Sequence, residues 1–161
     1  MNFQIRQATA EDIRPALDLA LRVFMEDDSQ DYGPEHTQRM RISIEERIAN
    51  LDIYLPGNRL IFVALDDNKK VIGIIETYGN NRISLMFVDS EYRRQGIATE
   101  LMRRMVHELK IRGFDKIVLN SSPNGLLFYR HFGFTIIETE KNINTPWKTP
   151  MSYPLNDIEM S

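Results

Sequence analysis

The spacing of apolar and polar side chains divides this chain into short strands and amphipathic helices. Residues 3–9 alternate between the two kinds, which is typical of a strand. Thr9 is followed three positions later by Asp12, which predicts a helix start with an imperfect capping box, since Asp replaces the usual Glu or Gln. We therefore expect, in order, a helix that ends near Met25, an acidic, turn-rich loop over 26–34, a second helix over 35–51 and a break at 55–58.

The remainder of the chain continues this alternation of element types. Gly79-Asn80-Asn81 separates two apolar runs and suits a tight hairpin, because Gly and Asn tolerate positive φ. The pattern predicts strands at 59–65, 71–78, 82–88, 115–120, 134–140 and 149–155, with a long helix over 96–112 and a short one over 124–132. The prolines of the last strand suit an edge position.

The predicted order is β-α-α-β-β-β-α-β-α-β-β, which indicates a mixed α/β fold. We expect a single domain over residues 1–161, with a mixed sheet of about six to seven strands and flanking helices. Strands joined by the hairpin should pair antiparallel, and strands joined through a helix should pair in parallel.

Composition narrows the classes of function. The 161 residues include no cysteine, which excludes disulfides, thiolate metal sites and a cysteine nucleophile, and fits a cytoplasmic protein. We expect no signal peptide and no membrane span, because no apolar run is long enough. A pI near 5.6 argues against a dedicated nucleic-acid binder. The three histidines fall on separate predicted helices without ligand spacing and read as surface residues, so we predict no metal site.

The net charge is −3, but residues 91–112 carry six Lys or Arg against three Glu. Arg93 and Arg94 stand side by side directly before the long helix. The first turn of a helix offers free N–H groups and the positive end of the helix dipole, so an anion is favoured there. Gly96 removes a side chain where a phosphate would approach, and Ala98 keeps the next turn small. A solvated turn is the alternative, and the stretch is neither GxGxxG nor GxxxxGK[ST].

This stretch resembles the phosphate loop of the GCN5-related N-acetyltransferases, the GNAT superfamily. That loop reads Arg/Gln-x-x-Gly-x-Gly/Ala, and Arg93-x-x-Gly96-x-Ala98 fits it. The later stretch DKIVLNSSPNGLLFYRHFGF resembles the second signature of the family, a strand followed by a short helix that carries a Tyr and ends in Gly-Phe. The resemblance covers the predicted strand order over nearly the whole chain. It implies a GNAT-like fold and acetyl-CoA as cosubstrate.

The resemblance also implies roles for particular positions. Backbone N–H groups from Arg94 to Thr99, which include Gln95 and Ile97, would bind the pyrophosphate of acetyl-CoA. Main-chain groups of Phe87 and Val88 would contact the pantetheine arm, with the Val88 N–H as an oxyanion donor. The family often has an Asn just before the short helix. The matching position here is Ser122, so the pantetheine contact stays open among Asn120, Ser122 and Asn124.

The implied reaction is direct attack of a primary amine on acetyl-CoA, with the two substrates held together. Tyr129 occupies the position of the family's acid and could protonate the leaving thiolate. Some members place a Glu on the strand before the phosphate loop, and this strand has none. Glu76, on the neighbouring strand, is either a base with a raised pKa or an edge-facing surface group. Asp89 could serve simply as a cap for the turn. The base stays unassigned.

The sequence does not identify the acceptor amine. The acidic residues of the loop between the first two helices could form a rim that favours cationic amines, or they could simply be a solvated loop. These residues are Glu26, Asp27, Asp28, Asp31 and Glu35. Trp147 could line a substrate pocket or anchor the last strand. Competing functions are a non-catalytic acyl-CoA-binding regulatory module and a protein-interaction domain. A homodimer is possible, since final strands of such domains often pair between subunits.

Overall fold

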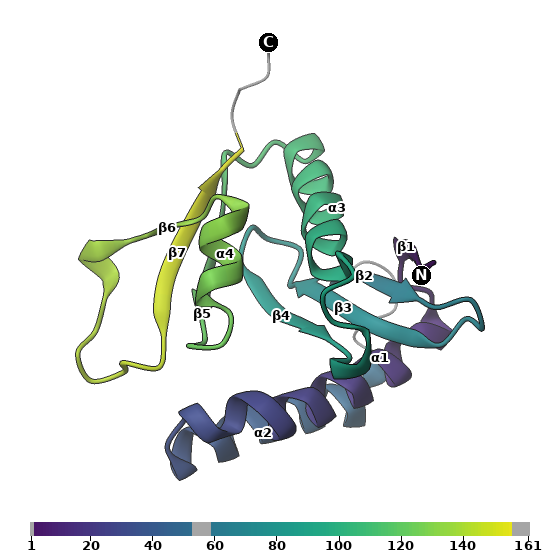
Figure 1. The fold of residues 1–161 in the computed structure, drawn as a ribbon, viewed down its shortest axis with the longest axis horizontal. Helices are drawn as coiled ribbons and strands as arrows, with labels where there is room; N and C mark the ends of the chain where they lie inside the picture. The colour runs from purple at the N-terminus through teal and green to yellow at the C-terminus, as the bar shows by residue number, and fades with distance from the viewer. Residues whose placement is uncertain (1, 53–58, 156–161) are drawn as a thin grey trace.

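The computed structural model describes residues 2–52 and 59–155, so the expected break at 55–58 lies outside the described residues. Within these residues it is a mixed α/β fold with seven strands in two sheets (Figure 1). The strands are β1 (Gln4–Gln7), β2 (Leu60–Leu65), β3 (Val71–Thr77), β4 (Ile83–Val88), β5 (Lys116–Ser121), β6 (Thr135–Ile136) and β7 (Thr149–Pro154). The α-helices are α1 (Ala10–Val23), α2 (Pro34–Ala49), α3 (Ile97–Ile111) and α4 (Leu126–Phe132).

The first sheet has the strand order β1-β2-β3-β4, and every pair in it is antiparallel. The expectation of parallel pairing across a helical connection is wrong for β1 and β2. Two helices and a long connection separate them in sequence, which leaves the chain free to return in either direction.

The second sheet has the order β5-β7-β6, so the last strand lies in the middle and the edge prediction for it is wrong. β6 lies opposite only Met151 and Ser152, and the prolines of β7 fall outside that overlap. Pro150 lacks an N–H but accepts a hydrogen bond at 2.8 Å from the N–H of Ile137 through its carbonyl. Met151 and Ser152 pair with β5 on one side and with β6 on the other. At these two residues β7 therefore offers no free edge to a second subunit.

Helices cover both faces of the first sheet (Figure 1). Alternate residues of β2 and β3 point to opposite faces, which is the period-two geometry of a strand. Phe62 and Ile75 pack in the cluster that contains the apolar stripe of α3. Val63 and Ile74 pack in the cluster that contains α1. All of these side chains are buried, so α1 and α3 are held on fixed faces of one sheet.

The two sheets meet at one end and separate at the other. Arg82, just before β4, forms an isolated parallel bridge with Val118 of β5. The N–H of Val118 donates to the carbonyl of Asn81 at 3.0 Å, and the Asn81 amide donates to the carbonyl of Lys116 at 2.9 Å. Beyond this bridge β4 and β5 belong to different sheets. The result is a split between two parallel strands that widens toward their C-terminal ends.

Two segments differ from the sequence predictions. The expected loop at 26–34 begins as helix: α1 runs into a π-helical turn, Phe24–Asp28, and then a 3₁₀ turn, Ser29–Asp31. Polar side chains stabilise these turns, because the Ser29 hydroxyl donates to the Met25 carbonyl at 2.7 Å and the Gln30 amide to the Glu26 carbonyl at 3.2 Å. The strand at 134–140 shrinks to β6 because a 3₁₀ turn, Glu138–Glu140, follows it.

Within the described residues, no helix combines the length and apolarity that a membrane span requires.

Candidate active site

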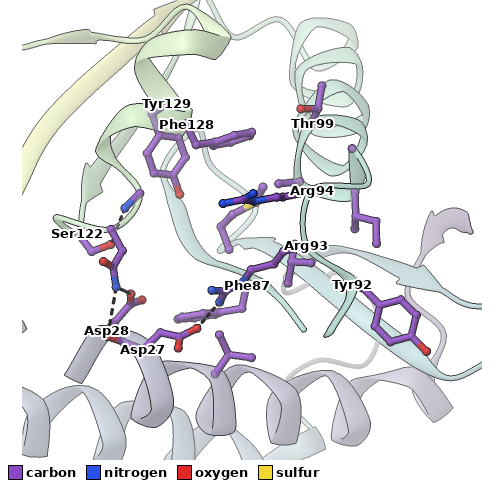
Figure 2. A pocket seen from close by; sticks show the side chains of 18 residues that line it. Asp27, Asp28, Phe87, Tyr92, Arg93, Arg94, Thr99, Ser122, Phe128 and Tyr129 are labelled. Carbon is purple, nitrogen blue, oxygen red and sulfur yellow. Dashed lines mark hydrogen bonds and ion pairs between the residues drawn. The ribbon is translucent and has the colours of Figure 1, made fainter. Parts of the chain in front are cut away.

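A cavity of about 380 Å³ occupies the split between β4 and β5 (Figure 2). Its walls come from the end of β4, the loop before α3, the start of α3, the β5–α4 connection, α4 and the turn after α1. It is lined by Val23, Asp27, Asp28, Met86, Phe87, Val88, Tyr92, Arg93, Arg94, Gly96, Ile97, Ala98, Thr99, Ser122, Asn124, Gly125, Phe128 and Tyr129. Segments far apart in sequence therefore converge on one site.

The loop between β4 and α3 is held in an unusual backbone conformation. Arg94 has φ of 64° and Gly96 has φ of 85°, both in the left-handed region. A β-carbon added to Gly96 would meet no atom within 4 Å, so the space above this residue is open. Among the described residues, no side-chain hydrogen bond caps the first turn of α3. Free N–H groups beside open space and two arginines fit an anion such as a pyrophosphate.

The end of β4 turns a backbone N–H toward the cavity. The N–H of Asp89 donates to the carbonyl of Ile72 on β3 at 2.9 Å. Because successive residues of a strand point their N–H groups to opposite sides, the Val88 N–H points away from β3 and into the split. The Asp89 side chain caps the next turn by accepting from the Glu91 N–H at 3.0 Å, as the sequence suggested. Val88 therefore offers a fixed donor at the cavity wall.

Tyr129 projects from α4 with its hydroxyl toward the cavity (Figure 2). Its side chain is buried, with 9% of the residue exposed. Burial raises the pKa of the Tyr129 phenol well above its usual value, and the negative charge of Asp28 and the neighbouring Tyr32 add to this shift. The phenol therefore keeps its proton at neutral pH and can act as a hydrogen-bond donor.

Contacts across the cavity tie the turn after α1 to the opposite wall. Asp27 forms an ion pair with Arg93 of the phosphate-loop candidate. The amide of Asn124 donates to the Asp27 carbonyl at 3.2 Å and to the Asp28 carboxylate at 2.9 Å. Asp27 and Asp28 thus face the cavity, whereas Glu26 and Glu35 are exposed away from its lining. These two aspartates are not simply part of a solvated loop, because both contact the opposite wall of the cavity.

Three of the residues proposed from the sequence as catalytic or cofactor-binding lie outside the cavity lining. Gln95 is exposed in the loop, and Asn120 is exposed on β5, where it lies opposite Pro150. Glu76 is fully buried at 0% exposure, so the surface-group interpretation is wrong. The other proposed catalytic and cofactor-binding residues, from Phe87 to Tyr129, line the cavity together.

The side chain of Glu76 contacts α2 and does not face the cavity. Its carboxylate accepts from Arg47 Nε at 3.2 Å and from the Ser84 hydroxyl at 2.7 Å. Arg47 is itself buried, with 5% of the residue exposed, and it also donates to the Tyr78 hydroxyl at 2.6 Å. A carboxylate held in this way fixes α2 against the sheet.

Sequence reasoning missed several lining residues. Gly125 lies against the ring of Tyr129, since a β-carbon there would come within 2.9 Å of Tyr129 Cε2. The NG pair at 124–125 marks the turn but gives no hint of this contact.

Sequence reasoning also placed all three histidines on the surface, which is wrong for His36. That ring is half-buried between Tyr32 and Trp147, at centroid distances of 4.7 and 5.2 Å.

Among the described residues, no group of three His, Cys, Asp or Glu side chains is arranged to hold a metal ion.

Comparison with known proteins identifies the fold family. The family model described as "Acetyltransferase (GNAT) domain" matches residues 28–155. The chain belongs to the GNAT acetyltransferase domain family. The family expected from the 93–98 motif is confirmed, and the match includes β2 to β7, α3 and α4.

Curated relatives share parts of this GNAT domain. Human N-acetyltransferase 8 is 29% identical over an alignment of 93 residues, and the match covers 50% of this chain and 41% of that protein. N-alpha-acetyltransferase 30 of Schizosaccharomyces pombe is 32% identical over an alignment of 83 residues, and the match covers 45% of this chain and 55% of that protein. The matches thus span about half the length of these relatives.

A solved structure extends the likeness to the whole fold. The PaiA N-acetyltransferase from Thermoplasma acidophilum, solved in complex with coenzyme A, superposes with a TM-score of 0.74 at 20% identity, covering 96% of this chain and 99% of that one. This likeness extends the GNAT fold to α1, which precedes the family match.

Proposed function

We propose that this chain is an acetyl-CoA-dependent N-acetyltransferase that transfers an acetyl group to a primary amine by direct attack. One observation carries the proposal: the loop at 93–98, the Val88 N–H and the Tyr129 hydroxyl meet in a single cavity. Two further findings support the same activity: the curated relatives are named N-acetyltransferases, and one similar structure contains coenzyme A.

The residues present fit acetyl-CoA. Open space above Gly96, an uncapped first turn of α3 and two arginines suit the pyrophosphate. Phe87 and Val88 at the end of β4, with Ser122 and Asn124 opposite, suit the pantetheine arm, whose amides can pair with strand edges. When bound, acetyl-CoA supplies the acyl group and the thiolate leaving group.

Val88 and Tyr129 divide the remaining chemistry. The Val88 N–H is placed to donate to the thioester oxygen, which gains negative charge as the amine attacks. The new bond would join the amine nitrogen to the acyl carbon, and the carbon–sulfur bond would break. The proton that the nitrogen loses would pass to water, and a Tyr129 that had given up its proton would regain one from water. Tyr129 keeps its proton and is placed to donate it, as a hydrogen bond or as a transferred proton, to the departing sulfur. In this scheme Glu76 does not act as the base, because its carboxylate accepts hydrogen bonds from Arg47 and Ser84.

We further propose that the chain acts as a single domain in the cytoplasm. The absence of cysteine fits a reducing compartment. It also helps the assay, because every thiol released during turnover comes from CoA.

The test is calorimetric titration with acetyl-CoA, followed by thiol release with a panel of primary amines. Wild-type protein should bind and turn over, whereas Gly96→Glu should lose binding, since its carboxylate would enter the anion site at a backbone φ that disfavours side chains. Binding without turnover on any amine would favour the regulatory-module alternative. Wild-type protein that fails to bind acetyl-CoA would remove both readings.

A further inference from the structure

The charged residues that line the cavity fall into two groups. Arg93 and Arg94 lie on the loop before α3, and Asp27 and Asp28 lie at the end of the π-helical turn after α1 (Figure 2). The ion pair between Arg93 and Asp27 crosses from one group to the other. The side chains in this pair are 46% and 27% exposed, so water and ligands can reach both. The pair is accessible enough to exchange partners.

Arg93 has two competing anions within reach once a cosubstrate arrives. Its guanidinium donates in a planar fork that matches the geometry of a carboxylate or a phosphate. A pyrophosphate above Gly96 would compete with Asp27 for this fork. When Arg93 turns to the phosphate, the Asp27 carboxylate loses its cation while it still lines the cavity beside Asp28.

The turn that carries Asp27 has a second anchor. Asn124 donates to the Asp27 carbonyl at 3.2 Å and to the Asp28 carboxylate at 2.9 Å. These bonds do not involve the Asp27 carboxylate, so they can persist when the ion pair breaks. Asp27 would then stay at the cavity wall, where Arg93 has already shown that a cationic group fits.

We propose that Asp27 binds a cationic group of the acceptor, and that Arg93 occupies this carboxylate until the pyrophosphate of the cosubstrate takes Arg93 over. The acceptor class is an amine with a second cationic group, because the reacting nitrogen must be neutral to attack while the second remains charged at Asp27. This inference rests on the proposed function. It makes Asp27 a specificity residue whose availability depends on the cosubstrate.

The first test titrates CoA into wild type, Asp27→Asn, Arg93→Gln and the double variant. Asp27→Asn should tighten CoA binding by up to about fivefold, the size expected for an exposed ion pair. In the Arg93→Gln background the same change should have no effect. Equal tightening in both backgrounds would mean simple repulsion by Asp27 and would overturn the proposal. Glu26→Gln, an equal charge change on the same turn, is the matched control and should leave binding unchanged.

The second test uses 1,5-diaminopentane as the cationic probe and 1,5-pentanediol as its neutral isostere. Coupling between two ligands is reciprocal, so a diamine that takes Asp27 should tighten CoA binding. We expect this effect in wild type, none with the diol, and none in Asp27→Asn. If CoA binds and the diamine changes nothing in wild type, the role of Asp27 is wrong and the proposed function stands. If CoA itself does not bind, both fail.

Discussion

The ring of Tyr129 lies against the bare α-carbon of Gly125, four residues earlier. A β-carbon at Gly125 would approach Tyr129 Cε2 to 2.9 Å, closer than side chains normally pack. Gly125 has φ of −88°, which any residue can adopt, so contact with the ring is the reason for a glycine here. The position of the candidate acid therefore depends on a residue that has no side chain.

Replacing Gly125 with Ala should displace the Tyr129 ring and lower kcat. The expected loss is about 10-fold to 100-fold, since misplacing a catalytic group by about 1 Å can cost that much. Steady-state kinetics with acetyl-CoA and the best amine of the panel would measure it. Gly33→Ala is the control, because Gly33 has negative φ and no atom within 4 Å of an added β-carbon. Equal kinetics for the two variants would argue against a constraint on the ring.

Removing the Tyr129 hydroxyl should affect the chemistry more than cosubstrate binding. Tyr129→Phe should lower kcat by about 10²-fold to 10⁴-fold, the usual contribution of a general acid, with the Kd for acetyl-CoA little changed. Tyr92→Phe is a matched control, because the Tyr92 hydroxyl donates to Asp66 at 3.1 Å and points away from Tyr129 (Figure 2). Undiminished turnover in Tyr129→Phe would remove the assigned role.

The buried ion pair between Arg47 and Glu76 should be needed for stability. Glu76→Gln leaves the Arg47 charge buried without its counter-ion, which costs about 3–5 kcal/mol in free energy of unfolding. The double variant Arg47→Met, Glu76→Leu should lose less, because it removes both charges. Urea unfolding of the three proteins would show the difference. If Glu76→Gln were as stable as wild type but lost all turnover, Glu76 would be a catalytic base after all.

Asp12 should make stability depend on acid pH. Burial raises the pKa of its carboxyl, but hydrogen bonds from the Thr9 N–H, from Arg6 and from the Thr9 hydroxyl outweigh burial, so the net pKa lies below the ordinary value of 3.8. The folded state therefore binds the proton less readily than the unfolded state. The stabilisation is present above the unfolded pKa and is lost as pH falls through the folded pKa.

Replacing Asp12 with Asn should therefore lower stability near neutral pH and flatten the acid side of the stability curve. Thermal unfolding between about pH 3 and pH 7 would measure both effects, since that range brackets the ordinary carboxyl pKa. Asp18→Asn is the control, because Asp18 and its partner Arg14 are both exposed and such pairs contribute little. An acid limb of unchanged slope in Asp12→Asn would contradict the assignment.

The sequence predicted the elements that local patterns determine. The Thr9–Asp12 start of α1 is confirmed, with the Thr9 N–H donating to the Asp12 carboxylate at 2.9 Å. The 93–98 motif predicted the family because it combines charge, a small residue and a helix start in one short stretch. Most residues of the proposed site lie in two such local stretches, and these stretches line one cavity.

Features that depend on long-range contacts were not predictable in this way. The partner of Glu76 is Arg47, 29 positions earlier, and no local pattern pairs them. The central position of β7 depends on where a two-residue strand pairs. The approach of Asp27 to Arg93, 66 positions away, depends on a π-helical turn whose hydrogen bonding has no strong sequence signal.

The split between β4 and β5 leaves two strand edges facing each other inside one molecule. Open edges attract other extended chains, and proteins usually block them with a bulge, a charge or a covering loop. Here the edge at Val88 lines the cavity together with residues of the loop before α3 and of α4. An occupant of the split would satisfy those backbone groups directly. The empty protein should therefore aggregate sooner on storage than the same protein kept with CoA.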